Sequence, residues 1–409
     1  MSRIFRAILF MLLLSIVTAN VSGQSRPALI DTPAREGSGQ PNLFRNTHGR
    51  VFLSWVEKVG EKRHRLRFAE YRRARWGEPR TIAEGDNWFV NWADFPSVVM
   101  LADQTMVAHW LVKSAPDTYA YDVNISRSTD GGRSWSKPLV PHRDGTKTEH
   151  GFVSLVGMAG GRVGAVWLDG RNMKEGGHDG HDSHGGEMTL RFATVDAWGR
   201  ISGEALLDGR VCECCQTSAA MTSEGPVAAY RDRSDKEVRD ISIVRLHKGR
   251  WTEPRTLHAD DWKIDGCPVN GPSIAANSRR VAVAWFTGVN DAPRVNLVFS
   301  DDAGATFGNA IRVDDGSPLG RVEVVLLRDE AALVIWLERT EKGAEVRARR
   351  IRADGSRDEA VVVTDTSAAR ASGFPQVVSS GDEVFFAWTE AGSSPRVRVA
   401  AMWVAGGRK

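Results

Sequence analysis

The sequence predicts an all-β protein that folds as a ring of seven β-sheet blades, a seven-bladed β-propeller. A short apolar strand that ends in an aromatic residue recurs seven times, first as Val51-Phe52-Leu53-Ser54-Trp55. The copies are 51 to 63 residues apart, and a period near fifty residues is typical of propeller blades. The aromatic residues that end the copies are Trp55, Trp110, Trp167, Tyr230, Trp285, Trp336 and Trp388.

The repeated strands are apolar or small on both faces. In the third copy, Val163, Ala165 and Trp167 alternate with Gly164 and Val166. A strand of this kind is covered on both faces, as it is between neighbouring blades. The alternative, a sandwich of two sheets, does not explain seven copies at so even a spacing.

The N-terminal 23 residues are predicted to be a secretory signal. Arg3 and Arg6 form its charged start, and an apolar run follows over residues 7–17. That run is too short to span a membrane comfortably, and no other segment approaches spanning length. We therefore expect an exported protein, periplasmic or secreted, without a membrane span, in which residues 24–409 form one propeller domain.

The charge balance gives no reason to expect nucleic acid or a charged membrane as partner. The whole chain carries a formal charge of +3, from 54 basic and 51 acidic residues. Without the two arginines of the signal, 52 basic residues face 51 acidic ones. A protein that tracks a phosphate backbone needs a larger and clustered positive charge.

Each repeat is predicted to contain four strands, counted from the channel of the ring outwards. The second strand is the one that ends in an aromatic residue, and residues 295–299 are an example of the third. The fourth begins at segments such as Trp76-Gly77-Glu78-Pro79, where proline costs little because an outer edge has no ladder partner. The innermost strand is predicted to begin at a proline in four units, at Pro41, Pro96, Pro272 and Pro375.

The seventh repeat ends after its third strand, near residues 397–402. An isolated apolar piece, residues 28–30, precedes the first repeat. We expect this piece to supply the missing outer strand beside Val399. Such a closure would remove an open edge and tie down both ends of the ring.

Two turns between third and fourth strands carry a tighter signature. Residues 128–135 read Ser-Thr-Asp-Gly-Gly-Arg-Ser-Trp, and residues 300–307 read Ser-Asp-Asp-Ala-Gly-Ala-Thr-Phe. Asp130 and Asp302 can accept backbone N–H bonds within the turn, while a following glycine adopts the unusual backbone angles. The final aromatic residue then fixes the turn on the blade.

These turns resemble the Asp boxes, or BNR repeats, of the sialidase superfamily. The repeat pattern resembles that superfamily over essentially the whole mature chain. The resemblance implies that Asp130 and Asp302 are structural and lie on the face away from the active site. Sialidases have six blades, so a six-bladed ring of sialidase type is the alternative to seven.

The catalytic signature of the sialidases is not matched in this chain. Their Phe/Tyr-Arg-Ile-Pro segment has Phe44-Arg45-Asn46-Thr47 as its nearest counterpart, and their three arginines and Tyr/Glu pair cannot be placed. We therefore expect weak or absent activity on ordinary sialosides. The general expectation is a propeller that binds a carbohydrate or similar polar ligand.

Loops from the fourth strand of one blade to the first strand of the next open on the face opposite the Asp boxes. They collect polar side chains around the channel mouth, as a binding site requires. If the ligand is hydrolysed, Glu149 and Asp94 are the candidates for general acid and base. Alternatively, Asp94, Gln216 and Asn270 only cap the first turn of a strand. The residues predicted to contact the ligand are Trp92, Arg171, Gln216, Asn270, Arg321 and Arg370.

The four cysteines lie in two consecutive loops of this face: Cys212, Cys214 and Cys215 in one, Cys267 in the next. In an exported protein, disulfides are the first interpretation. Cys267 would pair with Cys212 or Cys214, or a vicinal Cys214–Cys215 bridge would form a rigid apolar plate against a flat ligand. The alternative is a thiolate metal site.

Three histidines recur at every third position in a long loop of the third repeat. Such spacing can chelate a transition metal, although a solvated insertion that binds metal adventitiously has the same composition. With the cysteines they define a second functional hypothesis, a copper- or zinc-binding protein, and a third is a non-catalytic interaction scaffold. The histidines of this hypothesis are His142, His150, His178, His181 and His184.

Overall fold

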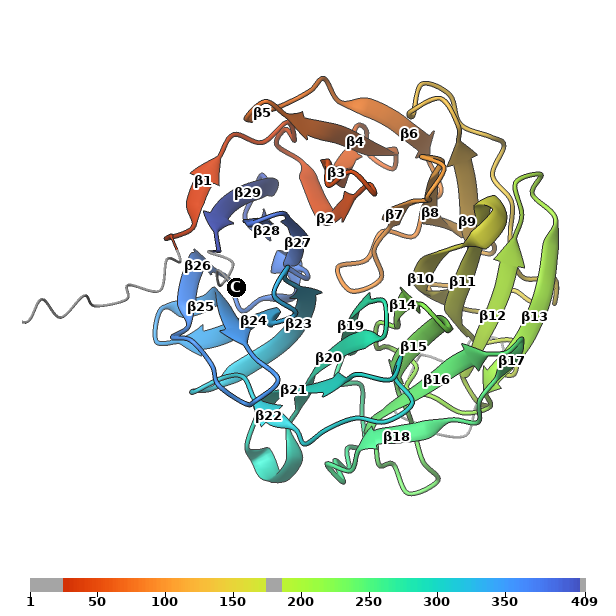
Figure 1. Cartoon of the computed structure of the whole chain (residues 1–409). Helices are drawn as coiled ribbons and strands as arrows, with labels where there is room; N and C mark the ends of the chain where they lie inside the picture. Colours follow the sequence, from red (N-terminus) through yellow and green to blue (C-terminus); the bar gives the residue numbers. More distant parts are fainter. Residues whose placement is uncertain (1–24, 174–185, 405–409) are drawn as a thin grey trace, which may run out of the picture.

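The computed structural model describes residues 25–173 and 186–404, which form a ring of seven β-sheets around a central channel (Figure 1). The predicted seven-bladed propeller is therefore confirmed, and the six-bladed alternative is wrong. The predicted signal and His178, His181 and His184 lie outside the described residues. Within the described part of the chain, no helix has the length and apolar character that crossing a membrane requires.

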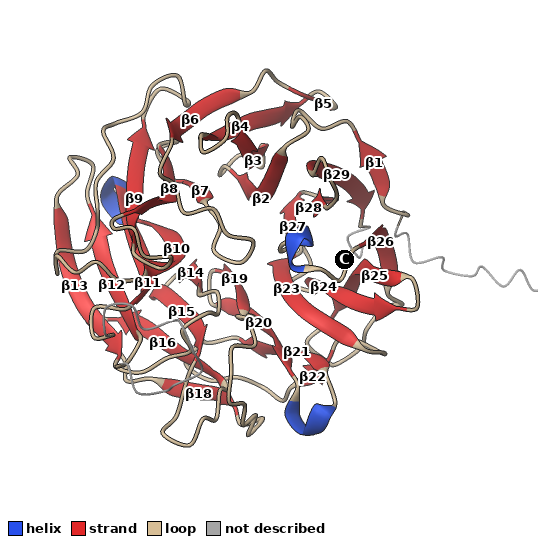
Figure 2. Ribbon diagram, turned by 180° about the vertical axis from the view of Figure 1, so that it is seen from behind, coloured by secondary structure: helices blue, strands red, loops and turns tan. Residues whose placement is uncertain are grey.

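The first four blades follow one another from the N-terminal side of the ring (Figures 1 and 2). In chain order, the first blade contains β2 (Ser38–Arg45), β3 (Val51–Lys58), β4 (His64–Arg72), β5 (Arg75–Trp76) and β6 (Arg80–Gly85), and the second contains β7 (Ser97–Met100), β8 (Met106–Lys113) and β9 (Tyr121–Ser128). The third blade contains β10 (His150–Met158), β11 (Arg162–Asp169), β12 (Thr189–Val195) and β13 (Ile201–Asp208). The fourth contains β14 (Ser218–Thr222), β15 (Gly225–Arg231), β16 (Ile241–His247), β17 (Arg250–Trp251) and β18 (Arg255–His258).

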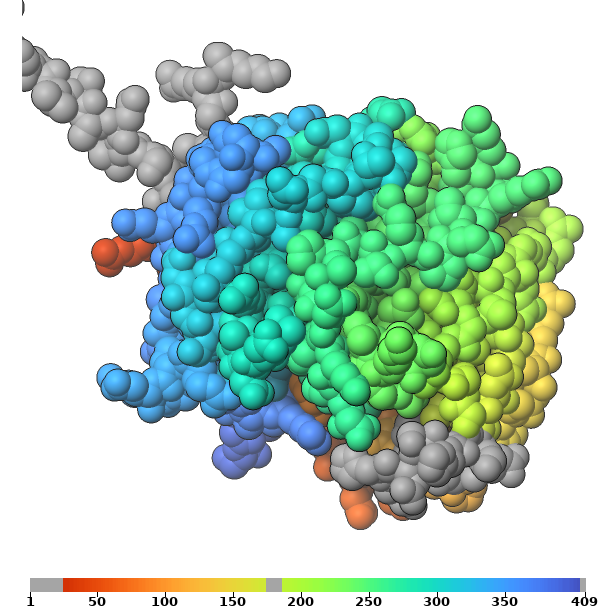
Figure 3. Space-filling model, turned by 90° about the horizontal axis from the view of Figure 1, so that it is seen from below, coloured from red at the N-terminus to blue at the C-terminus, as the bar shows by residue number. Residues whose placement is uncertain are grey.

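The remaining three blades complete the ring, and in Figure 3 the cyan and blue atoms of residues 273–403 lie beside the green atoms of the fourth blade. Three short 3₁₀ turns, Ala159–Gly161, Val289–Asp291 and Arg370–Ser372, connect strands. The strands are β19 (Ser273–Asn277), β20 (Arg280–Thr287), β21 (Arg294–Ser300) and β22 (Ile311–Arg312); β23 (Pro318–Leu326), β24 (Ala332–Thr340), β25 (Gly343–Ile351) and β26 (Val361–Thr366); and β27 (Gln376–Ser380), β28 (Glu383–Glu390), β29 (Arg396–Trp403) and β1 (Ala28–Ile30).

Three details differ from the predicted unit of four strands. The first and fourth blades each have five strands, because β5 and β6 both pair with β4, and β17 and β18 both pair with β16. The second blade has three strands, because residues near Pro138 make only an isolated bridge, Ile125 with Leu139, beside β9. Proline directly precedes β7, β19 and β27 as predicted, but Pro41 lies inside β2, at a shift of register between Gly39 and Asn42. A bulge tolerates proline because the ladder is already interrupted there.

The hydrophobic core lies between the blades rather than at one centre. One cluster joins Ala229 of the fourth blade to Trp285 of the fifth, and another joins Val107 of the second to Trp167 of the third. Each blade is therefore covered on its two faces by its two neighbours, which explains the apolar character of both faces of the repeated strands.

Four of the repeated tryptophans are fully buried, and each donates its indole N–H to a carboxylate. A buried indole N–H needs such an acceptor. The acceptor follows two residues later in three of the blades. The pairs are Trp55 with Glu57 at 2.7 Å, Trp167 with Asp169 at 2.8 Å, Trp285 with Asp260 at 2.7 Å and Trp336 with Glu338 at 2.7 Å.

In the turns at residues 128–135 and 300–307, the aspartate accepts hydrogen bonds from within its own turn. The Asp130 carboxylate accepts the backbone N–H groups of Arg133 at 2.9 Å and Ser134 at 3.0 Å. Gly132 has φ of +80°, and a Cβ there would lie 2.2 Å from the Phe68 ring. These turns leave the third strand, so they lie at the end of the blade opposite the loops that carry the cysteines.

The ring closes as predicted. Strand β1 pairs antiparallel with β29, with Leu29 opposite Ala400 and Ile30 opposite Val399. Beside this pairing, the Ser25 N–H donates to the Trp403 carbonyl at 3.0 Å. The seventh blade is thus built from both ends of the chain, and β29 has no free edge.

Removing residues 25–30 is expected to lower the free energy of unfolding by about 2–4 kcal/mol, from a few backbone hydrogen bonds at about 1 kcal/mol each. The exposed edge of β29 should also promote self-association. Urea denaturation and size-exclusion chromatography measure the two effects. Leu29→Asp is the matched control, because Leu29 is 71% exposed. A truncated protein that stays as stable and as monodisperse as this control would contradict the role of β1.

Candidate functional site

The channel mouth on the cysteine side is crossed by the segment between β6 and β7 (Figure 1). Trp92 of this segment stacks on Phe374 with ring centres 5.8 Å apart. The Arg321 guanidinium lies 4.8 Å from the centre of the Trp92 ring, and Gln216 donates to the Ala93 carbonyl at 2.7 Å. Contacts to the fourth, sixth and seventh blades thus hold this segment across the mouth.

Several predicted ligand contacts are engaged in holding the loops of this face. The Gln216 carbonyl oxygen accepts the Gly271 N–H at 3.1 Å, and the Asn270 oxygen accepts the Arg321 N–H at 2.7 Å. The Arg321 side chain donates to Ser372 Oγ at 2.7 Å. Burial, together with repulsion from the Arg370 charge, lowers the pKa of Arg321 to about 10. The structure therefore brings Trp92, Arg321 and Arg370 together, whereas Arg171 lies in the histidine cluster.

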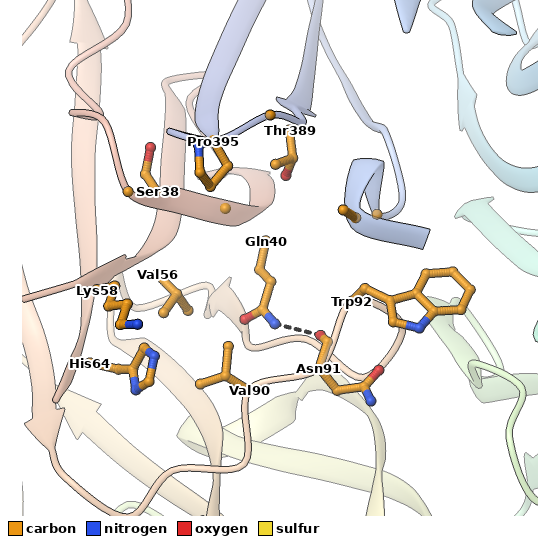
Figure 4. Close-up of a pocket in the computed structure, with 15 residues that line it drawn as sticks. Ser38, Gln40, Val56, Lys58, His64, Val90, Asn91, Trp92, Thr389 and Pro395 are labelled. Atoms are coloured by element: carbon orange, nitrogen blue, oxygen red, sulfur yellow. Dashed lines mark hydrogen bonds between the residues drawn. The ribbon is translucent and has the colours of Figure 1, made fainter. Parts of the chain in front are cut away.

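A pocket of about 260 Å³ lies beside Trp92, between the first and seventh blades (Figure 4). Gln40 and Asn91 reach it from different segments, and the Gln40 amide donates to the Asn91 carbonyl. Lys58 and His64 provide its titratable groups, and burial lowers the pKa of His64. The pocket therefore combines apolar walls with a few polar side chains, as small-molecule sites do.

The two predicted carboxyls, Asp94 and Glu149, are linked by Tyr121, which sequence reasoning missed. The Tyr121 hydroxyl lies 2.6 Å from Glu149 Oε1 and 3.0 Å from Asp94 Oδ2, and all three residues are buried. Asp94 Oδ1 also accepts the Phe152 N–H at 2.8 Å. Burial, with the nearby Glu149 charge, raises the pKa of Asp94 to about 8. At neutral pH Asp94 is therefore mainly protonated, so the Tyr121 hydroxyl can donate its one hydrogen bond to Glu149.

Asp94→Asn is expected to flatten the pH dependence of stability between about pH 4 and pH 8. The folded-state pKa of Asp94, about 8, exceeds the unfolded value near ~3.9, so folded protein binds more protons in this window. The contribution of Asp94 is therefore complete below about pH 4 and is lost as the pH rises, by at most ~1.4 kcal/mol per pH unit. Urea denaturation at a series of pH values measures this.

The pKa of Glu323 is also raised to about 8 by burial, and it remains in both proteins, so the difference between the two curves isolates Asp94. The stability of Asp94→Asn relative to wild type should rise with pH. Two parallel curves would show that Asp94 is ionised in the folded protein.

The predicted His142 and His150 lie together in a buried cluster beside β9 and β10. Their rings stack 3.7 Å apart at an interplanar angle of 5°. Arg171 borders the cluster, with Nε 2.7 Å from Asp169 Oδ1. Asp122 and Asp144, which no sequence pattern singled out, complete it.

The cysteine loop between β13 and β14 brings three sulfurs together. The sulfurs of Cys212, Cys214 and Cys215 all lie within 4.8 Å of one another. Cys212 Sγ is 3.9 Å from Cys214 Sγ and 3.0 Å from Cys215 Sγ. Cys212 and Cys215 are buried, whereas Cys214 is partly exposed and interacts with the exposed Cys267 of the next loop.

Two arginines and two glutamates frame this loop. Arg239 donates to Cys212 Sγ at 3.4 Å and to Glu213 Oε2 at 2.8 Å. The Arg233 guanidinium donates hydrogen bonds to the Glu213 carboxylate and, at 2.8 Å, to the Glu237 carboxylate. Glu213 stands between Cys212 and Cys214 in the chain, so this network fixes the backbone that carries the sulfurs.

The cysteine cluster favours one thiolate at Cys212. Burial opposes a charge there, but the Cys214 and Cys215 thiols and the Arg239 charge outweigh it and lower the pKa of Cys212 well below its usual value. Burial and the neighbouring Cys212 raise the pKa of Cys214 and Cys215. The cluster therefore favours a negative charge on Cys212 over Cys214 and Cys215, and a cation bound there would favour loss of the remaining protons.

The predicted disulfides are absent: all four cysteines are free thiols in the described structure. The sulfur separations exceed the ~2.05 Å of a disulfide. The sulfur nearest to Cys212 is Cys215, three residues on, rather than that of Cys267. Neither the bridge from Cys267 to the other loop nor the vicinal Cys214–Cys215 bridge is formed.

No protein-family model and no curated protein matches this sequence. Several solved structures resemble its fold. A Dyadobacter fermentans protein of unknown function is 14% identical over 93% of this chain and 99% of its own, with a TM-score of 0.54. An α-L-arabinanase of Penicillium chrysogenum, complexed with arabinobiose, is 12% identical over 94% and 97%, with a TM-score of 0.50. A Streptococcus pneumoniae sialidase is 10% identical over 87% and 83%, with a TM-score of 0.47. By its fold, the chain is a seven-bladed β-propeller.

Proposed function

We propose that this protein is an exported metal-binding propeller whose cysteine loop holds a thiophilic transition-metal ion, Cu(I) or Zn(II). One observation carries the proposal: the sulfurs of Cys212, Cys214 and Cys215 converge within 4.8 Å. Thiolates select these metals over harder cations.

The sulfur spacing fits a metal better than a disulfide. Zinc–sulfur bonds of about 2.3 Å at tetrahedral angles place two sulfurs ~3.8 Å apart. The Cys212–Cys214 separation of 3.9 Å matches this value, and Cys215, at 3.0 Å from Cys212, must move by about 1 Å. The exposed Cys267 lies on the open side of the cluster, where it can receive an incoming ion or complete the coordination.

The Cys212→Ser/Cys215→Ser double variant is expected to bind the metal at least about 1,000-fold more weakly, because Cys214 is then the one thiol left in the three-sulfur cluster. Competition with a chromophoric chelator measures the affinity, and metal analysis gives the stoichiometry. Cys267→Ser keeps the three-sulfur cluster and should weaken binding by about 10-fold or less. Equal affinity of the double variant and wild type would contradict the proposal.

The pocket beside Trp92 favours a second candidate function, the binding of a small polar ligand such as a glycan. Its polar side chains, Gln40, Lys58 and His64, can contact hydroxyl or carboxylate groups. Arabinobiose and sialyllactose are suitable probes, given the arabinanase and sialidase of similar fold. Titration calorimetry should show binding that Gln40→Ala weakens about 10-fold. Heats equal to buffer for both sugars would argue against these glycans as ligands.

Hydrolysis is less well supported by the geometry. Asp94 and Glu149 are buried around the Tyr121 hydroxyl, which is itself fully buried. A Cβ at Gly151 would lie 2.0 Å from Asp94 Oδ2, so the backbone packs directly on this carboxyl. We infer that the three residues hold the second and third blades together.

A further inference from the structure

The histidine cluster contains buried nitrogens that are left without hydrogen-bond partners. His150 is fully buried and His142 is 7% exposed. Nδ1 of His150 and Nε2 of His142 form no hydrogen bond among the described residues. Native interiors satisfy nearly all such groups, so each unsatisfied one requires an explanation.

The unpartnered atoms converge on one carboxylate. Asp122 Oδ1 lies 3.5 Å from His150 Nδ1 and 3.8 Å from His142 Nε2, and it too has no hydrogen-bond partner among the described residues. The three atoms lie within 4.8 Å of one another. We propose that Asp122, His142 and His150 form a binding site for a divalent transition-metal ion, Zn(II) or Cu(II), separate from the cysteine cluster.

Asp144 orients the two rings for this role. Its Oδ2 lies 3.3 Å from His142 Nδ1 and 3.3 Å from His150 Nε2, the nitrogens on the far side of each ring. Protons on these nitrogens place lone pairs on His142 Nε2 and His150 Nδ1, which face Asp122. Metal-binding histidines commonly turn their other N–H toward a carboxylate in this way.

The spacing suits a cation at the centre of the three atoms. Metal–nitrogen and metal–oxygen bonds of about 2.0–2.2 Å at tetrahedral angles put ligand atoms ~3.4 Å apart. The measured 3.5 Å and 3.8 Å are near this value, and the two imidazole rings, which stack at an interplanar angle of 5°, must tilt so that their lone pairs converge on the ion. The Asp122 side chain is 23% exposed, so the site opens to solvent on that side and leaves a position for water or a further ligand.

The local charges leave Asp122 as the carboxylate available to a cation. Arg171 makes two bonds of 2.7 Å to Asp169 and lies 3.3 Å from Asp144. The ion pairs that the structure gives for Asp122 are those with the two histidines. Two imidazoles and one carboxylate form a harder ligand set than three thiolates, and it suits Zn(II) or Cu(II) rather than Cu(I).

The test uses the full chain with seven serine replacements, so that neither the cysteines nor the histidine-rich loop can hold metal. Calorimetric titration of this background protein with Zn(II) and with Cu(II) should show one bound equivalent. Asp122→Asn and His142→Gln should each weaken binding by about 100-fold or more, beyond the effect of losing an outer-shell partner. His247→Gln is the matched control, because His247 also faces a carboxylate, 3.3 Å from Glu224. The replaced residues are His178, His181, His184, Cys212, Cys214, Cys215 and Cys267.

Cu(II) electron paramagnetic resonance on the background protein gives a second readout that does not need the variants to fold. Coupling to two imidazole nitrogens is expected. A background protein that is folded by circular dichroism yet binds no metal would overturn the proposal. So would Asp122→Asn and His142→Gln variants that bind as tightly as His247→Gln. Because the background lacks all four cysteines, these results are independent of the thiolate site.

Discussion

Replacing Trp336 by alanine is expected to lower the free energy of unfolding by about 3–5 kcal/mol, the range for losing a large buried aromatic side chain. Trp336 is fully buried in the cluster between the fifth and sixth blades. Its indole N–H donates to Glu338 Oε2 at 2.7 Å, and Glu338 also accepts the Ser317 N–H. The substitution therefore opens a cavity and removes one partner from a buried carboxylate.

Urea denaturation followed by circular dichroism measures this loss. Trp198→Ala is the matched control, because Trp198 is 79% exposed and its replacement should change stability by no more than about 0.5 kcal/mol. Trp336→Phe should fall between the two, since it keeps most of the packing and loses the donor. A loss below about 1 kcal/mol for Trp336→Ala would show that the repeated aromatic residue does not stabilise the interface between the blades.

Replacing Arg231 by methionine is expected to cost about 3–5 kcal/mol, because three buried carbonyls lose a charged donor. Arg231 is 1% exposed. It donates to the carbonyls of Asn270 at 2.8 Å, Arg239 at 2.5 Å and Phe286 at 2.7 Å. The backbone carbonyl of Arg231 accepts the Cys212 N–H at 3.1 Å. Arg231 therefore joins both cysteine-bearing loops to the fourth and fifth blades.

The same substitution should weaken metal binding at the cysteines, because the Arg231 guanidinium no longer holds the backbone of Arg239, whose side chain donates to Cys212 Sγ. Stability and metal affinity are measured together on one preparation. Arg398→Met is the matched control, since Arg398 pairs with Glu390 at an exposed position, where an ion pair contributes at most about 1 kcal/mol. An Arg231→Met protein as stable as this control would contradict the role given to the buried guanidinium.

The ring could be predicted because its determinants repeat. Seven aromatic-ended strands set the number of blades, and the apolar residues 28–30 were the missing strand of the last one. Both follow from a local pattern that any blade must satisfy. The indole–carboxylate pairs were also readable, as a tryptophan followed two residues later by an acid at Trp55, Trp167 and Trp336.

The candidate sites were predicted less completely, because they depend on irregular loops. Asp122 is the second residue of β9, whereas His142 lies in the long segment before β10. No repeating sequence spacing predicts that these two residues meet. Gln216 and Asn270 are polar and close to the channel, yet their amides are bound to the backbone of neighbouring loops. Only the loop conformations decide which polar groups remain available.

The cysteines show the same limit. Their positions in consecutive loops predicted that they meet, and the structure brings Cys212, Cys214 and Cys215 together with Cys267 beside them. Their redox state does not follow from spacing, because a Cys-x-Cys-Cys loop can present sulfurs either to one another or to an ion. The buried Arg239 donates to Cys212 Sγ, a contact that no local sequence pattern predicts.

Metal analysis combined with thiol counting on the purified protein tests the thiolate site most directly. We predict about one equivalent of copper or zinc per chain at the cysteines, with Cys212, Cys214 and Cys215 protected from alkylation until a chelator removes the metal. Mass mapping of the alkylated peptides identifies which thiols change. A protein without bound metal, in which any of these three cysteines is joined in a disulfide, would contradict the account.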